Sequence, residues 1–254
     1  MTGLPLSGRR VVVTRAEEQA ASLADGLRQR GAVPLLVPSI SFVPPEDPGP
    51  LRRAARQIDR AAWVVFTSAT GVAFGWGAIR EAWPGGLPEG VRVAAIGTGT
   101  EDAAREAGAP VHFVPREALG DVLVDELPLE SGDRIVLLRS DIGRPSIAQR
   151  LERRGADVRD VTAYRTLTHA DPQAVADALR QRPDAITFTS PSTVRGFLGT
   201  AGLADGLREA GSPALVAIGP VTAEALEPFG LSADAIAEPH TVAGLLATLE
   251  TLFA

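Results

Sequence analysis

The chain has 254 residues, of which 45% are hydrophobic and 22% charged, and 25 basic residues against 31 acidic ones give a net charge of -6 at pH 7. This length suits one or two domains of about 150 residues each. Cysteine is absent, which excludes disulfides, thiolate nucleophiles and thiolate metal sites.

The 25 basic residues are all arginine. Without lysine the chain can form no Schiff base and has no phosphate-loop lysine, so guanidinium is its only strong cation. The acidic balance argues against a nucleic-acid partner, because such proteins present a basic face. Residues 1–10 lack a basic leader with an apolar core, and no run approaches the roughly 18 apolar residues of a membrane span. We therefore expect a cytoplasmic protein without membrane contact.

Short apolar runs alternate with longer segments of helical period. The run 10–14 predicts a strand, and Leu23 and Leu27 then lie on one face of a helix that ends at Gly31. Nine further strands are predicted at 33–37, 62–67, 91–96, 111–114, 134–138, 157–162, 185–189, 214–218 and 234–237. Ten strands with intervening helices predict an α/β fold with mostly parallel sheets.

The two halves of the chain share sequence blocks in the same order. At an offset of 124 residues, Arg15, Leu23, Leu27, Arg30, Gly31 and Ala32 fall on Arg139, Ile147, Leu151, Arg154, Gly155 and Ala156. At an offset of 122, Phe66-Thr67-Ser68 falls on Phe188-Thr189-Ser190, and Ala95-Ile96-Gly97 with Thr100 falls on Ala217-Ile218-Gly219 with Thr222. So long a period indicates two domain-sized copies, because solenoid repeats run about 20 to 50 residues. About five strands per copy suffice for a flavodoxin-like open sheet.

The repeated blocks all lie where a strand ends and a helix begins, the edge at which open α/β sheets bind ligands. A helix start offers unpaired N–H groups and a positive dipole end, and so binds anions without lysine. If the two copies face one another, the cleft between them suits a large polyanion. A hydroxyl at a helix start is by itself more often only an N-cap, so this prediction depends on Ser68, Thr100, Ser190 and Thr222 together.

Two other ligand signals are incomplete. Gly97-Thr98-Gly99 resembles a dinucleotide loop but lacks the third glycine, and its copy Gly219-Pro220-Val221 lacks the middle one. His112, His169 and His240 have no metal-ligand spacing. We therefore expect no cofactor and no metal.

Tyr164 is the only tyrosine, and it follows the predicted strand 157–162 at the position that matches Ile40 in the first copy. A lone tyrosine is most often a packing residue. Here, however, cysteine and lysine are absent and no histidine is suitably placed. A phenol is then among the few groups able to donate a proton near neutral pH.

Taken together, the ordered motifs resemble those of the uroporphyrinogen-III synthase family. They are Val64-Val65-Phe66-Thr67-Ser68, Ala95-Ile96-Gly97 with Thr100, the helix end 151–155 leading to Val161-Thr162-Ala163-Tyr164-Arg165-Thr166, Phe188-Thr189-Ser190-Pro191-Ser192, and Ala217-Ile218-Gly219 with Thr222. The resemblance runs from Arg9 to about Leu249. It implies two flavodoxin-like lobes with the site in the cleft between them, one domain being 1–39 with 166–254 and the other 40–165. The sequence alone would divide the chain once, near residue 125.

The resemblance also implies the reaction. The family's substrate, hydroxymethylbilane, is a linear tetrapyrrole with eight carboxylates. Its terminal hydroxyl is expelled, the resulting azafulvene is attacked at the substituted carbon of ring D, and a spiro intermediate closes with that ring inverted. The product is uroporphyrinogen III, a precursor of haem, sirohaem and cobalamin, and no cofactor takes part. Uncatalysed closure gives the uninverted isomer, so much of the catalysis is positioning. We expect this lyase to be a monomer.

By the same resemblance Tyr164 is the proton donor. Substrate carboxylates are assigned to Arg15, Ser68, Thr70, Gly97, Thr100, Arg139, Ser190, Ser192, Gly219 and Thr222. Some members carry a basic residue at the position of Thr70, so a charged contact is missing there. Arg15, Arg139 and Arg165 are placed to supply it.

Two other functions stay open at this point. A tetrapyrrole-binding or regulatory protein could use the same scaffold without turnover, although the presence of Tyr164, Thr100 and Thr222 disfavours it. A two-lobed enzyme acting on a nucleotide or sugar phosphate is disfavoured by the missing lysine and the incomplete glycine loop.

Overall fold

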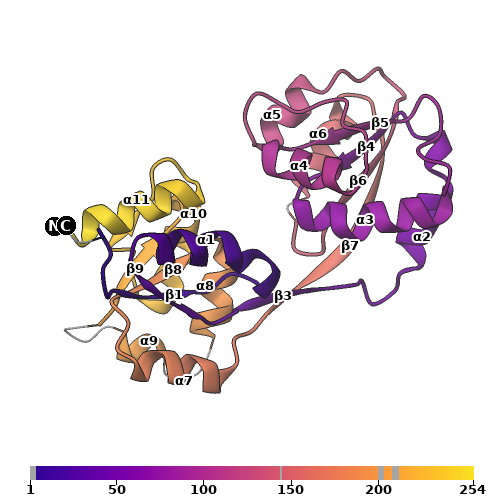
Figure 1. The fold of residues 1–254 in the computed structure, drawn as a ribbon. Helices are drawn as coiled ribbons and strands as arrows, with labels where there is room; N and C mark the ends of the chain where they lie inside the picture. Colours follow the sequence, from indigo (N-terminus) through magenta and orange to yellow (C-terminus); the bar gives the residue numbers. More distant parts are fainter. Residues whose placement is uncertain (1–3, 144, 200–202, 208–211) are drawn as a thin grey trace. The chain divides into compact units, whose positions relative to one another are not determined.

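The computed structural model describes residues 4–143, 145–199, 203–207 and 212–254, and the chain divides into two compact units (Figure 1). Unit 1 comprises Met1–Ser41 and Leu167–Ala254, and unit 2 comprises Phe42–Thr166. Each contains one five-stranded sheet in which the described pairings are predominantly parallel, so the predicted α/β class is confirmed. That the units are separate domains divided at 39/40 and 165/166 stays a prediction.

The sheet of unit 1 has the strand order β10-β9-β8-β1-β2. Its strands are β1 (Arg10–Val13), β2 (Val33–Leu36), β8 (Ala185–Phe188), β9 (Ala214–Ala217) and β10 (Ala235–Ile236). Its helices are α1 (Glu17–Gln29), α7 (Pro172–Arg180), α8 (Pro191–Leu198), α9 (Leu203–Gly206), α10 (Pro220–Glu224) and α11 (Val242–Leu252), with a 3-10 turn η2 (Glu227–Phe229).

Both faces of this sheet are covered by helices. Val11 and Val13 point to one face, where they pack with residues of α1 and α11. Val12 points to the other face and packs with residues of α7 and α8. Because a parallel strand buried on both faces needs apolar side chains in both directions, the uninterrupted Val11-Val12-Val13 run forms a central strand.

The sheet of unit 2 has the order β3-β7-β6-β4-β5. Its strands are β3 (Ile40–Val43), β4 (Trp63–Phe66), β5 (Arg92–Ala95), β6 (Arg134–Ser140) and β7 (Asp157–Thr168). Its helices are α2 (Gly49–Arg56), α3 (Ala69–Ala82), α4 (Thr98–Glu106), α5 (Gly120–Glu126) and α6 (Ser146–Arg153), with a 3-10 turn η1 (Ile58–Arg60).

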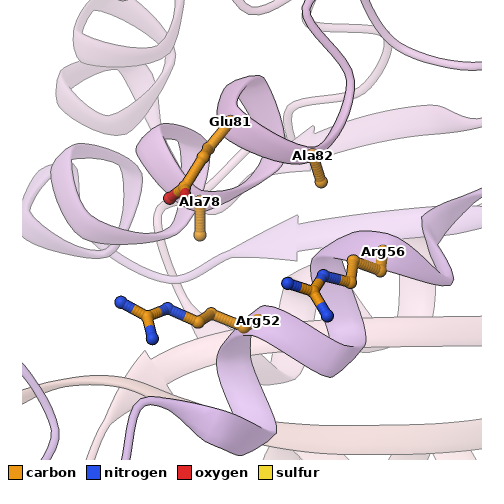
Figure 2. Close-up of a pocket in the computed structure, with 5 residues that line it drawn as sticks. All are labelled: Arg52, Arg56, Ala78, Glu81 and Ala82. Atoms are coloured by element: carbon orange, nitrogen blue, oxygen red, sulfur yellow. The ribbon is translucent and has the colours of Figure 1, made fainter.

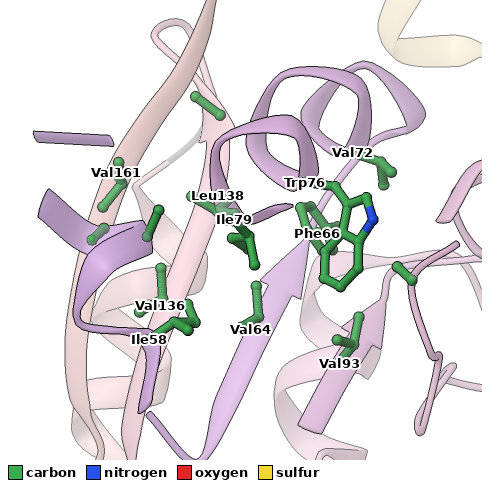
Figure 3. Packing of buried hydrophobic residues seen from close by; sticks show 14 of the residues in the cluster. Ile58, Val64, Phe66, Val72, Trp76, Ile79, Val93, Val136, Leu138 and Val161 are labelled. Carbon is green, nitrogen blue, oxygen red and sulfur yellow. The ribbon is translucent and has the colours of Figure 1, made fainter. Parts of the chain in front are cut away.

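Two hydrophobic clusters cover the faces of this second sheet. Val64 and Phe66 pack against α3, beside Trp76 (Figure 3). Trp63 and Val65 point the other way and pack with residues of α5 and α6. The side chains of β4 alternate between the two faces, and those on one face pack against α3, the helix that follows β4 in the sequence.

The structure differs from the strand prediction in three segments. Residues 111–114 form no strand, and only Phe113 makes an isolated bridge to Ala94. Strand β3 was not predicted, because Pro38 and the polar Ser39 and Ser41 interrupt the apolar pattern. Strand β7 continues past 162 to Thr168, so Tyr164 lies inside a strand, not after one. Within the described residues, no helix combines the length and apolar character needed to span a membrane.

Candidate active site

The carboxyl ends of β4, β5 and β6 meet at one edge of the unit 2 sheet. Phe66, near this edge, pairs with Ala95 on one side and Leu138 on the other. Ser68 and Gly97 lie two residues beyond the ends of β4 and β5, and Arg139 is the next-to-last residue of β6. The structure therefore brings this part of the predicted site to one edge, where open parallel sheets bind ligands.

Tyr164 and Ser68 are in direct contact at this edge. The phenolic oxygen of Tyr164 lies 3.1 Å from Ser68 Oγ, and either group can be the donor. Ser68 is the N-cap of α3, where its Oγ accepts a hydrogen bond from the backbone N–H of Gly71 at 2.9 Å. The contact joins a strand and a helix 96 residues apart in the sequence, and both residues had been predicted to belong to the site.

Aromatic rings enclose the Tyr164 side chain. Phe74 stacks on it with ring centroids 5.7 Å apart and an interplanar angle of 18°. Phe42 approaches edge-on at 5.5 Å and 88°. Tyr164 is only 6% exposed, so its ring is held by packing and its hydroxyl is directed toward Ser68.

The helix starts of unit 2 also position Gly97, Thr100 and Thr70. The carbonyl of Gly97 accepts the N–H of Thr100 at 3.0 Å, which begins α4. A Cβ at Gly97 would lie 2.6 Å from Cβ of Ala118, so the close approach of that neighbour requires glycine. The side chains of Thr70 and Thr100 are buried in the first turns of α3 and α4. A ligand at these turns would therefore meet backbone amides before hydroxyls.

The remaining predicted residues lie at the corresponding edge of unit 1. Ser190 caps α8 and forms a capping box with Thr193, and Ser192 is buried in the first turn of that helix. Gly219 precedes α10, whose Thr222 is also buried. The predicted set is thus divided between the units, with Arg15, Ser190, Ser192, Gly219 and Thr222 in unit 1.

Arg15 follows β1 in unit 1 and is partly buried. Its Nε is buried without a hydrogen bond in the described part of the chain, and its Nη2 makes only a 3.5 Å contact with Gln19 Oε1. Burial lowers the pKa of Arg15 below its usual value. The Nε–H of Arg15 is therefore available to donate a hydrogen bond to a ligand.

Arg139 and Arg165 are, in contrast, occupied by acidic partners. Arg139 donates from Nε and Nη2 to both carboxylate oxygens of Asp160, at 2.7 and 2.6 Å. Its Nη1 donates to the carbonyls of Ser140 and Gly143. Arg165 pairs with Glu46. In both cases much of the positive charge is already neutralised.

Two pockets of unit 2 differ in their relation to the site. One of about 380 Å³ opens at the carboxyl edge and is lined by Thr67, Ile96, Leu119, Gly120, Asp121, Arg139, Gly143, Ser146 and Ile147. Another of about 260 Å³ lies between α2 and α3, lined by Arg52, Arg56, Ala78, Glu81 and Ala82 (Figure 2). Only the first pocket contains a predicted site residue, Arg139.

Two of the three histidines make local backbone contacts. Nδ1 of His112 accepts the N–H of Val93 at 2.9 Å, and Nδ1 of His240 lies 2.7 Å from the carbonyl of Ala237. No group of three or more His, Asp or Glu side chains suited to a metal ion occurs in the described ranges.

Sequence reasoning missed Phe42, Phe74 and Asp141. Phe74 lies on the same buried side of α3 as its neighbours in the cluster, a periodicity that predicts packing but not the partner. Phe42 lies in the strand that was not predicted. Asp141 bonds with both Tyr164 and Thr166, and nothing in the sequence pattern indicated this contact.

Comparison with known proteins gives one consistent answer. The family model described as "Uroporphyrinogen-III synthase HemD" matches residues 21–247. The uroporphyrinogen-III synthase of Synechococcus elongatus is 30% identical over 98% of this chain and 97% of its own length, and that of Chlorobaculum parvum is 28% identical over 90% and 92%.

A solved structure supports the fold. The chain is similar to a mutant uroporphyrinogen III synthase from Thermus thermophilus, with a TM-score of 0.62 and 22% identity over 96% of this chain and 98% of that one. The resemblance seen in the motifs is confirmed by the family match over most of the sequence. The chain therefore belongs to the uroporphyrinogen-III synthase family, the cyclising lyases of tetrapyrrole biosynthesis.

Proposed function

We propose that this chain cyclises hydroxymethylbilane to uroporphyrinogen III, and that the phenol of Tyr164 protonates the hydroxyl that leaves the substrate. One observation carries the assignment of the proton donor: the phenolic oxygen is 3.1 Å from Ser68 Oγ at the carboxyl edge of the unit 2 sheet. Loss of the hydroxyl as water leaves the azafulvene in its protonated, cationic form, and the phenolic oxygen becomes a phenolate. The phenolate regains a proton when ring closure releases one from the substrate.

Ser68 is suited to stabilise that phenolate. A serine hydroxyl has one donor hydrogen and two acceptor lone pairs. The N–H of Gly71 uses one lone pair of Ser68 Oγ, so the hydroxyl hydrogen is available to the phenolic oxygen. The positive end of α3, a helix of 14 residues, favours negative charge at the same place. Both effects act more strongly on the phenolate than on the neutral phenol, as a catalytic interaction requires.

Carboxylate recognition is proposed for the helix starts of both units. The acetate and propionate groups of the substrate would bind to main-chain N–H groups at the beginnings of helices. The residues proposed at these helix starts are Ser68, Thr70, Gly97, Thr100, Ser190, Ser192, Gly219 and Thr222. Arg15 is proposed as a cationic contact, because its Nε has no hydrogen-bond partner among the described residues. Arg139 as a substrate contact stays a prediction, since a carboxylate would compete there with Asp160.

The same proposal includes the architecture of the enzyme. The chain would form two flavodoxin-like lobes derived from an internal duplication, with the substrate in the cleft between them. Numbered within unit 1, the sheet order is 2-1-3-4-5, which is the flavodoxin-like order. In unit 2, β7-β6-β4-β5 corresponds to β2-β1-β8-β9 of unit 1, and these are the strands that the repeated sequence blocks pair. We further propose that the enzyme acts as a cytoplasmic monomer and binds no nucleic acid.

The test compares the wild-type chain with Tyr164→Phe. Each is supplied with hydroxymethylbilane, and the ratio of type III to type I uroporphyrinogen is measured after oxidation. The wild type should give type III product, and Tyr164→Phe should lower turnover about 100-fold or more while leaving the folded structure intact. Wild-type turnover in Tyr164→Phe would overturn the proton-donor assignment. Type I product alone from the wild type would overturn the activity and favour a tetrapyrrole-binding protein.

A further inference from the structure

Strand β7 contains a bulge next to Tyr164. Leu138 pairs with Val161 and Arg139 with Thr162, but Ser140 pairs with Tyr164, so Ala163 is an extra residue without its own partner. Bulges are rare between parallel strands, and they re-aim side chains near active sites. The position of this bulge therefore bears on the direction of the Tyr164 ring.

The bulge brings Tyr164 to the face of the sheet covered by α3. Val161 and Ala163 both belong to the cluster on that face, as residues two apart in a strand should. In regular alternation residue 164 would point to the opposite face. Tyr164 nevertheless belongs to the same cluster as Ala163 and contacts Ser68. Two successive side chains on one face are possible only because the pairing shifts between them.

Asp141, one residue beyond the end of β6, closes the ladder across this irregular segment. Its N–H donates to the carbonyl of Tyr164 at 3.1 Å. Its Oδ1 accepts the N–H of Thr166 at 3.0 Å and the hydroxyl of Ser140 at 2.8 Å. In a regular parallel ladder a backbone carbonyl would accept the bond from the residue at 166. The carboxylate of Asp141 takes the place of that carbonyl.

We propose that Asp141 is a positioning residue, whose carboxylate holds the shifted register of β7 and so directs Tyr164 toward Ser68. This proposal rests on the role of Tyr164 as proton donor. Asp141 makes two hydrogen bonds to β7, from its N–H to the carbonyl of Tyr164 and from its carboxylate to the N–H two residues later. Asp141 is exposed, so it adds little apolar packing, and its effect on the strand comes through these hydrogen bonds.

The experiment uses three variants of the full chain. Asp141→Ala removes the acceptor, whereas Asp141→Asn keeps a side-chain oxygen that can accept from Thr166. The matched control is Asp133→Ala, at the opposite end of β6, where Oδ2 accepts the N–H of Glu130 at 2.9 Å. Asp141→Ala should lower kcat on the order of 10- to 100-fold with little change in KM, because a small misplacement of a catalytic group costs rate and not binding. Asp141→Asn and Asp133→Ala should stay within about threefold of the wild type, equivalent to about 0.65 kcal/mol.

A second measurement follows the tyrosine itself. Because Tyr164 is the only tyrosine, ring-labelled tyrosine gives one set of NMR signals, whose shifts report contact with Phe42 and Phe74. These signals should move or divide in Asp141→Ala and stay unchanged in Asp133→Ala. This readout does not depend on activity, so it tests the positioning of Tyr164 even if Tyr164→Phe proves fully active and the proton-donor role fails.

Three results would overturn the proposal: wild-type kcat in Asp141→Ala, a lowered kcat with unchanged tyrosine signals, or equal losses in Asp141→Ala and Asp141→Asn. Should Asp141→Ala fail to fold, Ser140→Ala removes the hydroxyl that bonds to the carboxylate. That variant should move the tyrosine signals away from their wild-type positions, and unchanged signals would then count against the role of Asp141.

Discussion

The phenolic oxygen of Tyr164 and the hydroxyl oxygen of Ser68 lie 3.1 Å apart, and the same serine oxygen caps α3 through Gly71. One side chain thus contributes both to the start of a helix and to the surroundings of the proposed acid. Its removal should have two effects of different size, one on stability and one on turnover.

Replacing Ser68 by alanine should lower the free energy of unfolding by about 1 kcal/mol, because an N-cap is lost, and should also reduce turnover. Thr241→Ala is the matched control, since Thr241 caps α11 by accepting the N–H of Gly244 at 3.1 Å. It should lose similar stability and keep full activity. Chemical denaturation and the product assay distinguish the two effects. Equal turnover in both variants would show that the Ser68 contact does not serve catalysis.

Arg15→Met should weaken substrate binding without lowering the stability of the protein. Burial of Arg15 leaves its Nε without a hydrogen bond in the described ranges, and such a donor costs free energy that methionine would not incur. We expect an unchanged or higher free energy of unfolding together with a KM raised about tenfold, equivalent to about 1.4 kcal/mol. Arg28→Met, which breaks an exposed pair with Asp25, should change neither quantity. A clear loss of stability in Arg15→Met with unchanged KM would identify Arg15 as purely structural.

Gly196 and Gly77 should respond oppositely to substitution by alanine. A Cβ at Gly196 in α8 would overlap the carbonyl oxygen of Ser39. Among the described residues, a Cβ at Gly77 in α3 would meet no atom within 4 Å apart from its chain neighbours and the backbone of its own helix. Gly196→Ala should therefore cost about 2 kcal/mol or more, since a backbone atom must move. Gly77→Ala should stabilise the protein by about 0.5 to 1 kcal/mol through helix propensity. Thermal unfolding of both variants tests this, and a tolerated Gly196→Ala would contradict the close packing of α8 on Ser39.

The Asp184 carboxylate should make stability depend on pH in the acid range. Partial burial opposes its ionisation, but bonds from the Arg10 N–H and the Arg9 guanidinium outweigh burial and hold the pKa of Asp184 below its ordinary value of 3.8. The contribution is therefore fully present above that ordinary value and is lost as the pH falls through the lower pKa of the folded state.

Asp184→Asn should accordingly be less stable than the wild type by on the order of 1 kcal/mol at pH 7, and the difference should shrink below about pH 4. Denaturant titrations at several pH values measure it. Asp25→Asn, which loses an exposed pair with Arg28, should show only a few tenths of a kcal/mol at neutral pH. If the difference in free energy of unfolding between wild type and Asp184→Asn did not change with pH, the stabilisation could not come from the ionised carboxylate.

The sequence was most informative where burial imposes a simple pattern. Central strands such as β1 and β4 have apolar side chains on both faces, so their runs were visible without alternation. Residues 111–114 were overpredicted, because a β-branched and aromatic pair suggested a strand where only Phe113 bridges. Strand β7 was cut short, because Arg165, Thr166 and Thr168 are polar and continue the strand only through pairing with distant segments.

The candidate site was predictable in its residues but not in its contacts. Tyr164 and Ser68 could be named, because one is the sole phenol and the other follows a strand in a repeated block. Their contact depends on a bulge, which shifts the face of a side chain by one residue and leaves no mark in hydrophobic alternation. The partners of Arg139 were equally hidden, since Asp160 becomes its neighbour only through the pairing of β6 with β7.

The two-for-one pairing opposite Ser140 makes the number of residues in this segment as important as their identity. Ala163 contributes only a methyl group, and many substitutions there would keep the count. Deleting it would restore regular alternation and send the side chain at 164 to the opposite face. When related sequences are aligned, a gap between Val161 and Tyr164 should therefore indicate a change in the direction of the tyrosine more strongly than a substitution of any single small residue in this segment.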